Sequence, residues 1–225
     1  MRKRILSARK GKALRRILTA AAALLLANHF LMVGFLFPFQ ALRRCEEQTG
    51  SGRTAVVCRD WAREVRWDRL MYLTGNEEAV LFSEISLGPL GWSPGVGQVL
   101  DCTKGLPLYA GWRTTSEARG ERGASILYIF GRVDDPDIAR LEVQAQYEEW
   151  KTVGGARHTA LTWDSGREDW MERDGKWYFL FRTYPPFDWS SFGSCVYPLI
   201  IGYDEAGEEI ARLDVEEHWT EGRGY

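Results

Sequence analysis

The chain has 225 residues, enough for one domain with a sizeable core, and its 29 Lys and Arg nearly balance its 31 Asp and Glu. Eight of the basic residues precede residue 17, so the rest of the chain carries 21 basic against 31 acidic residues, a net charge of −10. This acidic bulk argues against a nucleic-acid partner and against close docking on an anionic surface.

The segment from Ile17 to Phe37 has no charged residue and follows a strongly basic N-terminus. As a helix it would span roughly 31 Å at ~1.5 Å per residue, which matches a hydrocarbon core of ~30 Å. We therefore expect a basic cytoplasmic tail at 1–16, a transmembrane helix at 17–37 and the C-terminal bulk outside the cell, following the positive-inside bias. The alternative is a cleaved signal peptide, which the length of the run and the lack of a small-residue cleavage pattern disfavour.

The next segments are expected to lead from the membrane into the domain. Residues 38–59 are polar, with Gly and Ser at their centre, and are expected to form a stalk before a β-rich domain at 60–225. The stretch from Asp60 to Leu73 fits the apolar pattern of a helix and that of a strand equally well. A strand is expected over Ala79–Ile85. LGPLGWSPGVGQVL, residues 87–100, is rich in Gly and Pro, which predicts a loop.

The C-terminal half has the features of a β domain. Two hairpins are predicted, one around Asp174-Gly175, which suits a type I′ turn because both central residues need positive φ, and one around Asp204–Gly207. Short strands divided by regular turns indicate a mainly β fold of the β-sandwich type. The expected strands are Leu106–Trp112, Ser125–Phe130, Ile138–Gln146, Trp170–Met171, Trp177–Leu180, Leu199–Tyr203 and Glu209–Val215.

Two stretches also resemble a known group of proteins. ILYIFGRVDDPDIARLEV, residues 126–143, and LIIGYDEAGEEIARL, residues 199–213, resemble a loosely defined set of uncharacterised, membrane-anchored extracytoplasmic proteins of Gram-positive bacteria. These share a G-x-V/I-x-D-P-x-I strand–turn–strand and a final Y/F-D-x-x-G hairpin, and Gly111-Trp112-Arg113 is similar to a Gly-Trp element before them. The resemblance covers about the last half of the chain. It implies a β domain behind an anchor and no activity, and the four Cys and ten Trp depart from it.

All four Cys residues lie on the side expected to be extracytoplasmic, where disulfides persist. Four Cys allow three pairings, and we favour Cys45–Cys58 together with Cys102–Cys195. Unpaired buried thiols are the alternative. The chain has no C-x-x-C, so neither a thioredoxin-like site nor a zinc knuckle is indicated.

Patterns for metal binding and catalysis are weak. The acids of Asp134–Asp137 are close enough to suggest Ca²⁺, but their spacing does not match the EF-hand and a Pro interrupts them, so a turn is favoured. G-x-S-x-G is absent, and neither His158 nor His218 has a motif linking it to a Ser. We expect no metal, no cofactor and no enzyme activity.

Aromatic residues offer the best candidates for a binding surface. Trp is used in cores and at interfaces alike, and most of the ten Trp are expected in the core. The aromatic loop Thr183–Cys195 and two Trp in Gly-rich or Pro-rich surroundings are the preferred exceptions. The candidate ligand or partner residues are Trp92, Trp112, Tyr184, Phe187, Trp189 and Phe192.

These features predict a cell-membrane protein that acts as a binding, sensor or accessory interaction module. Its expected partners are the lipid bilayer and another envelope protein or cell-wall glycan. Two alternatives are a cell-envelope hydrolase acting on wall glycan or peptide, and a purely structural anchor-stalk protein. An interaction module predicts an exposed aromatic patch, whereas an enzyme predicts a cleft holding two acids or an acid with a His.

Overall fold

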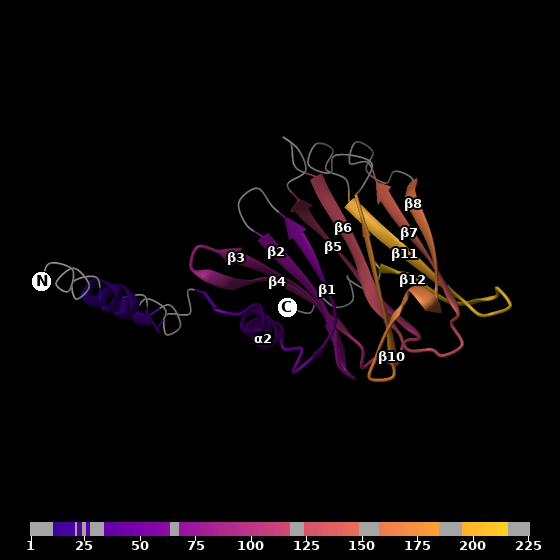
Figure 1. The fold of residues 1–225 in the computed structure, drawn as a ribbon. Coiled ribbons are helices and arrows are strands. Elements are labelled where there is room, and N and C mark those ends of the chain that lie inside the picture. Colours follow the sequence, from indigo (N-terminus) through magenta and orange to yellow (C-terminus); the bar gives the residue numbers. More distant parts are fainter. Residues whose placement is uncertain are drawn as a thin grey trace, which may run out of the picture.

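The computed structural model describes residues 11–20, 22–23, 26–27, 34–63, 68–117, 124–148, 158–184 and 195–215. These residues form three four-stranded antiparallel sheets and the helix α2 (Figure 1), so the expected mainly β fold is confirmed. Within the described ranges no helix combines the length and apolar character that crossing a bilayer requires. Residues 21, 24–25 and 28–33 of the expected transmembrane segment lie outside these ranges, and its last four residues, 34–37, are not helical, so the expected helix end at residue 37 was wrong.

The first sheet, which we call sheet A, is built from four consecutive strands. They are β1 (Ala55–Arg63), β2 (Asp68–Gly75), β3 (Ala79–Gly88) and β4 (Gly91–Asp101), paired in that order. The predicted loop over 87–100 was wrong, because only residues 89–90 form a turn and the others complete β3 and form most of β4. Pro94 is tolerated there because β4 is an edge strand and its pairing shifts where Pro94 faces Ile85.

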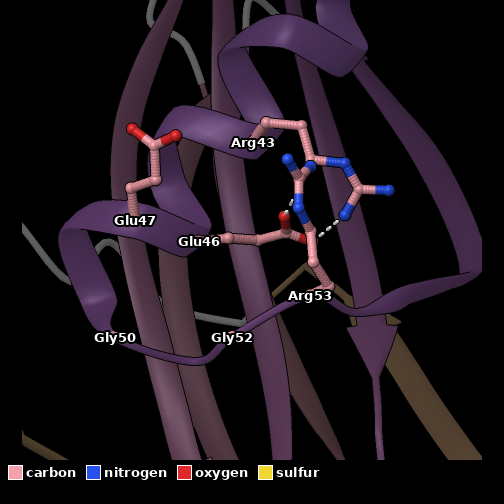
Figure 2. Close-up of a pocket in the computed structure, with 6 residues that line it drawn as sticks. All are labelled: Arg43, Glu46, Glu47, Gly50, Gly52 and Arg53. Carbon is pink, nitrogen blue, oxygen red and sulfur yellow. Dashed lines mark hydrogen bonds and ion pairs between the residues drawn. The ribbon is translucent and has the colours of Figure 1, made fainter.

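The helix α2 (Pro38–Thr49) stands where a stalk was expected. Pro38 suits the first helical turn, and Gly50 ends the helix with a φ of 69°. The helix is mostly polar, but Ala41, Leu42, Cys45 and Glu46 are buried, so a narrow stripe packs on sheet A while the opposite side, with Arg44 and Glu47, is exposed. Figure 2 shows the C-terminal part of this helix with Glu46 beside Arg43 and Arg53.

The other two sheets, which we call sheets B and C, are built from the hairpins that follow sheet A in the chain. Sheet B contains β5 (Leu108–Glu117), β6 (Ala124–Val133), β10 (Lys176–Thr183) and β9 (Met171–Arg173), in that spatial order. Sheet C contains β12 (Glu209–Asp214), β11 (Cys195–Tyr203), β7 (Arg140–Glu148) and β8 (His158–Gly166). Successive hairpins therefore join sheets B and C alternately, and the short helix η1 (Arg167–Asp169) leads from β8 to β9.

The predicted hairpins are confirmed. β9 and β10 pair across Asp174 and Gly175, whose φ values are 52° and 74°, as a type I′ turn requires. β11 and β12 pair across the second turn, where Asp204 N donates to Glu208 O at 3.0 Å and Gly207 has a φ of 86°. The strands expected near 106–112, 125–130 and 138–146 are present as β5, β6 and β7.

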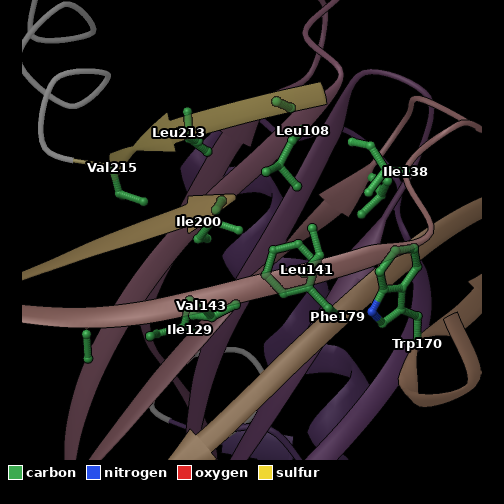
Figure 3. Packing of buried hydrophobic residues seen from close by; sticks show 14 of the residues in the cluster. Leu108, Ile129, Ile138, Leu141, Val143, Trp170, Phe179, Ile200, Leu213 and Val215 are labelled. Atoms are coloured by element: carbon green, nitrogen blue, oxygen red, sulfur yellow. The ribbon is translucent and has the colours of Figure 1, made fainter. Parts of the chain in front are cut away.

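Sheet B lies between sheets A and C and is buried on both faces. All residues of 126–133 on β6 are buried, which explains why this stretch is apolar without alternation. Tyr128 and Phe130 pack toward sheet A, whereas Leu127 and Ile129 pack toward sheet C. The core between sheets B and C is shown in Figure 3 and includes Leu108, Ile129, Ile138, Leu141, Val143, Trp170, Phe179, Ile200, Leu213 and Val215.

Candidate functional site

The end of the apolar segment is attached directly to the edge of sheet A. Phe35 N donates to Trp92 O at 2.6 Å, and Trp92 N donates to Phe35 O at 2.7 Å. Gly34 is buried, and a Cβ at this position would lie 2.4 Å from the carbonyl oxygen of Leu90. Only glycine allows this close approach. The chain therefore passes from its apolar segment into the sheet without a linker.

Large apolar side chains are exposed around this attachment. Phe37 and Phe39 stack with ring centroids 5.7 Å apart, and Trp61 meets Trp92 edge-to-face at 6.0 Å. Clusters of exposed apolar side chains mark interaction sites more often than isolated ones do. We call this cluster the junction patch; its members, each 42–58% exposed, are Leu36, Phe37, Phe39, Trp61 and Leu90.

A buried carboxylate fastens the C-terminal half of α2 to sheet A. Glu46 is 3% exposed, and its Oε1 accepts hydrogen bonds from Thr54 N at 3.0 Å, from Thr54 Oγ1 at 2.6 Å and from Arg43 Nη1. The Thr54 hydroxyl also lies 2.8 Å from that of Thr74 on β2. Burial raises the pKa of Glu46, but the hydrogen bonds from Arg43 and Thr54 outweigh it and the pKa is lowered. The ionised carboxylate thus fixes the helix on the sheet.

The same carboxylate lies in a pocket of about 340 Å³ at the C-terminal end of α2 (Figure 2). Arg53 Nη1 lies 3.9 Å from Glu46 Oε2 and is largely exposed at the rim. Because Arg43 and Thr54 hold Glu46 in its ionised form, it is poorly suited to donate a proton in catalysis. The pocket is lined by Arg43, Glu46, Glu47, Gly50, Gly52 and Arg53.

The predicted binding residues that the structure describes do not form one surface. Trp92 lies on β4, on the face of sheet A that α2 covers, and Trp112 lies on β5, packed against the core between sheets B and C. Tyr184 follows β10 and is 37% exposed, with Arg182 Nη2 at 3.3 Å from its hydroxyl. Phe187, Trp189 and Phe192 lie outside the described residues. Trp92 and Trp112 are thus separated by the backbones of sheets A and B.

The predicted disulfides are absent among the described cysteines, since Cys45, Cys58 and Cys102 are free thiols. Cys45 faces sheet A from α2, whereas Cys58 packs against the core on the opposite face of that sheet. Cys102 belongs to the core between sheets A and B, and Cys195 is part of β11 in sheet C. A sheet therefore stands between the members of each expected pair. Burial raises the pKa of Cys45 and of Cys58 to about 11 and that of Cys102 to about 12.

A buried ion pair that the sequence did not predict lies between sheets A and B. Arg132 on β6 is 1% exposed, and its Nη1 donates to the carbonyl oxygens of Asn76 at 2.7 Å and Glu77 at 3.1 Å. Its Nη2 lies 2.6 Å from Asp134 Oδ2. Burial disfavours the charged guanidinium, but Asp134 compensates and the pKa of Arg132 is raised. The one available signal was an Arg within an otherwise apolar strand.

Asp135 has the turn-making role that the sequence predicted. Its Oδ1 accepts a hydrogen bond from Asp137 N at 2.9 Å, and its carbonyl accepts one from Ile138 N at 3.3 Å. Within the described parts of the chain, no three His, Cys, Asp or Glu side chains are grouped as metal ligands. Asp134 serves Arg132 instead of the turn.

Comparisons with protein-family models, curated proteins and solved structures find no match to this chain. The resemblance of 126–143 and 199–213 to membrane-anchored extracytoplasmic proteins therefore stays a prediction. The geometry of the junction between α2 and sheet A is the feature that bears most directly on function.

Proposed function

We propose that this chain is a single-pass membrane protein with a cytoplasmic N-terminus, whose β-rich domain works as an interaction module at the external membrane surface. The observation that carries the proposal is the attachment of Phe35, at the end of the uncharged segment, to Trp92. With α2 fastened to sheet A through Glu46, this attachment leaves no stalk between the segment and the domain. A domain built this way would be held against the bilayer rather than projected from it.

The partner class that we propose is another envelope protein. Glycan-binding surfaces use exposed aromatic faces, but Trp92 and Trp112 are each partly buried by packing against a core. A protein is the other partner class that the sequence predicts, and the partly buried positions of Trp92 and Trp112 favour it over a glycan.

Membrane extraction and a topology reporter test this proposal. The full chain, fused at its C-terminus to alkaline phosphatase or to green fluorescent protein, is expressed in a bacterial host. We expect it to resist alkaline carbonate extraction, with an active phosphatase and a dark fluorescent protein. The matched control, Leu24→Arg with Leu25→Arg, places two charges in the apolar run and should release the chain from the membrane. Recovery of the unaltered chain in the soluble fraction, or a fluorescent C-terminus, would overturn the proposal.

A further inference from the structure

We propose that the junction patch lies in the interface of the same bilayer that holds the preceding apolar segment. The N-terminal turn of α2 and the tip of the β3–β4 hairpin would then face lipid, and sheet C would lie farthest from the membrane. This inference rests on the proposed function and goes further, because it assigns the orientation of the domain and the lipid-contacting side chains.

Few residues separate the apolar segment from the β domain, and this short connection keeps the junction patch close to the bilayer. A residue adds at most ~3.6 Å, so Leu36 lies within about 11 Å of residue 33 in any conformation. The interfacial layer on each side of the hydrocarbon core is roughly 5–8 Å thick. Leu36 and Phe37 therefore stay in or beside that layer. Leu90 accompanies them because its carbonyl lies against Gly34, and Figure 1 shows the β3–β4 tip on the side from which the N-terminal chain arrives.

The chemistry of the patch fits a lipid interface. Its five members are aliphatic or aromatic, and Phe and Trp are residues that membrane interfaces favour. Arg44 follows Phe39 by about one and a half turns of α2 and is 43% exposed, so its guanidinium group can reach phosphates beside the buried rings, whereas Arg43 stays with Glu46. Because the external part of the chain is acidic, the apolar side chains would carry the attraction, and docking should occur on phosphatidylcholine, which is zwitterionic and has no net charge.

A second copy of the chain is a poorer occupant. Stable protein interfaces use about 20–30 residues on each side, whereas the patch has five exposed members. The bilayer also needs no further encounter, because the preceding segment already lies in it. The patch would thus be covered whenever the chain is anchored.

Spin labels at two matched positions test the orientation. A nitroxide is attached through a genetically encoded keto side chain at position 90 or at position 210, and the full chain is reconstituted in phosphatidylcholine vesicles. Ile210 is the control because it is also an exposed aliphatic residue, but it lies on β12 in sheet C. At position 90 we expect relaxation by O₂ to exceed relaxation by a water-soluble nickel chelate, and at position 210 the reverse. Phe37→Glu with Phe39→Glu should raise the chelate accessibility of position 90 several-fold.

Each outcome separates this inference from the proposed function. If position 90 is as accessible to the chelate as position 210 while the chain remains in the vesicles, docking is wrong and anchoring stands. If the chain does not stay in the vesicles, the proposed function fails. If position 90 shows dipolar coupling between labels, and dilution with unlabelled lipid abolishes both the coupling and the protection, a second copy covers the patch and the inference is overturned.

Discussion

Replacing Arg132 by Met should strongly destabilise the contact between sheets A and B. The change removes a guanidinium that is 1% exposed and that serves two backbone carbonyls and Asp134. Deleting one partner of a buried ion pair costs ~3–5 kcal/mol. Asp134 is 18% exposed and keeps Lys176 Nζ at 3.8 Å, so we expect a value near the lower end of that range, about 3 kcal/mol.

Arg140→Met is the matched control. Arg140 pairs with Asp164, but their side chains are 41% and 64% exposed, so the expected loss is at most about 1 kcal/mol. Urea unfolding of the full chain in detergent micelles, followed by Trp fluorescence, measures both variants. If Arg132→Met loses no more stability than Arg140→Met, the assignment of Arg132 as a link between the two sheets is refuted.

Three further predictions concern buried groups near sheet A. The pKa of Glu46 is lowered from its ordinary 4.5, so the carboxylate stabilises the fold above that value and this contribution is lost as the pH falls through the folded pKa. The free energy of unfolding should therefore decrease as the pH is lowered below 4.5, and Glu46→Gln should weaken this pH dependence. If the variant and the unaltered chain lose stability equally in acid, the role of Glu46 is contradicted. The thiol pKa values of Cys45 and Cys102 are about 11 and about 12, so both thiols should react with iodoacetamide at mildly alkaline pH only after unfolding. Peptide mass spectrometry measures this reaction. Labelling of both cysteines in the native chain would speak against their burial. In Gly75→Ala the new Cβ would lie 2.4 Å from the hydroxyl oxygen of Tyr178, so the free energy of unfolding measured in urea should fall by ~1–3 kcal/mol. Adding Tyr178→Phe should recover part of this loss. If Gly75→Ala leaves stability unchanged, the Tyr178 ring shifts freely.

Local chemistry made some elements predictable from sequence. Asp174-Gly175 specifies a turn through backbone conformations that few other residue pairs adopt, and the structure has that turn. The apolar run on β6 indicated a strand, since β-branched and aromatic residues suit a pleated, buried surface. In both cases the determining interactions lie within a few residues of each other.

Elements that depend on distant contacts were missed. The helix α2 has only a narrow apolar stripe, so its polar majority suggested a stalk, and its stability comes from packing on sheet A. β4 contains Pro94 and several Gly, which an edge strand with shifted pairing tolerates. Ruling out a disulfide between Cys45 and Cys58 required knowing which face of sheet A each residue occupies. Predicting the partners of Arg132 required knowing which residues lie across from β6. None of these facts is carried by residues adjacent in sequence.

The alternating order of the hairpins has a consequence for folding. Sheet A consists of consecutive strands with local pairing, whereas β6 must wait for β10, which follows both strands of the β7–β8 hairpin of sheet C. Pairing between strands far apart in sequence is slow because a long loop must close first. Sheets B and C should therefore form together in a single late and cooperative step. A growing polypeptide that ends before β10 lacks Tyr178 and Phe179, so both cores would be incomplete and part of their apolar surface would be open to water, which makes this stage of synthesis the one most exposed to aggregation.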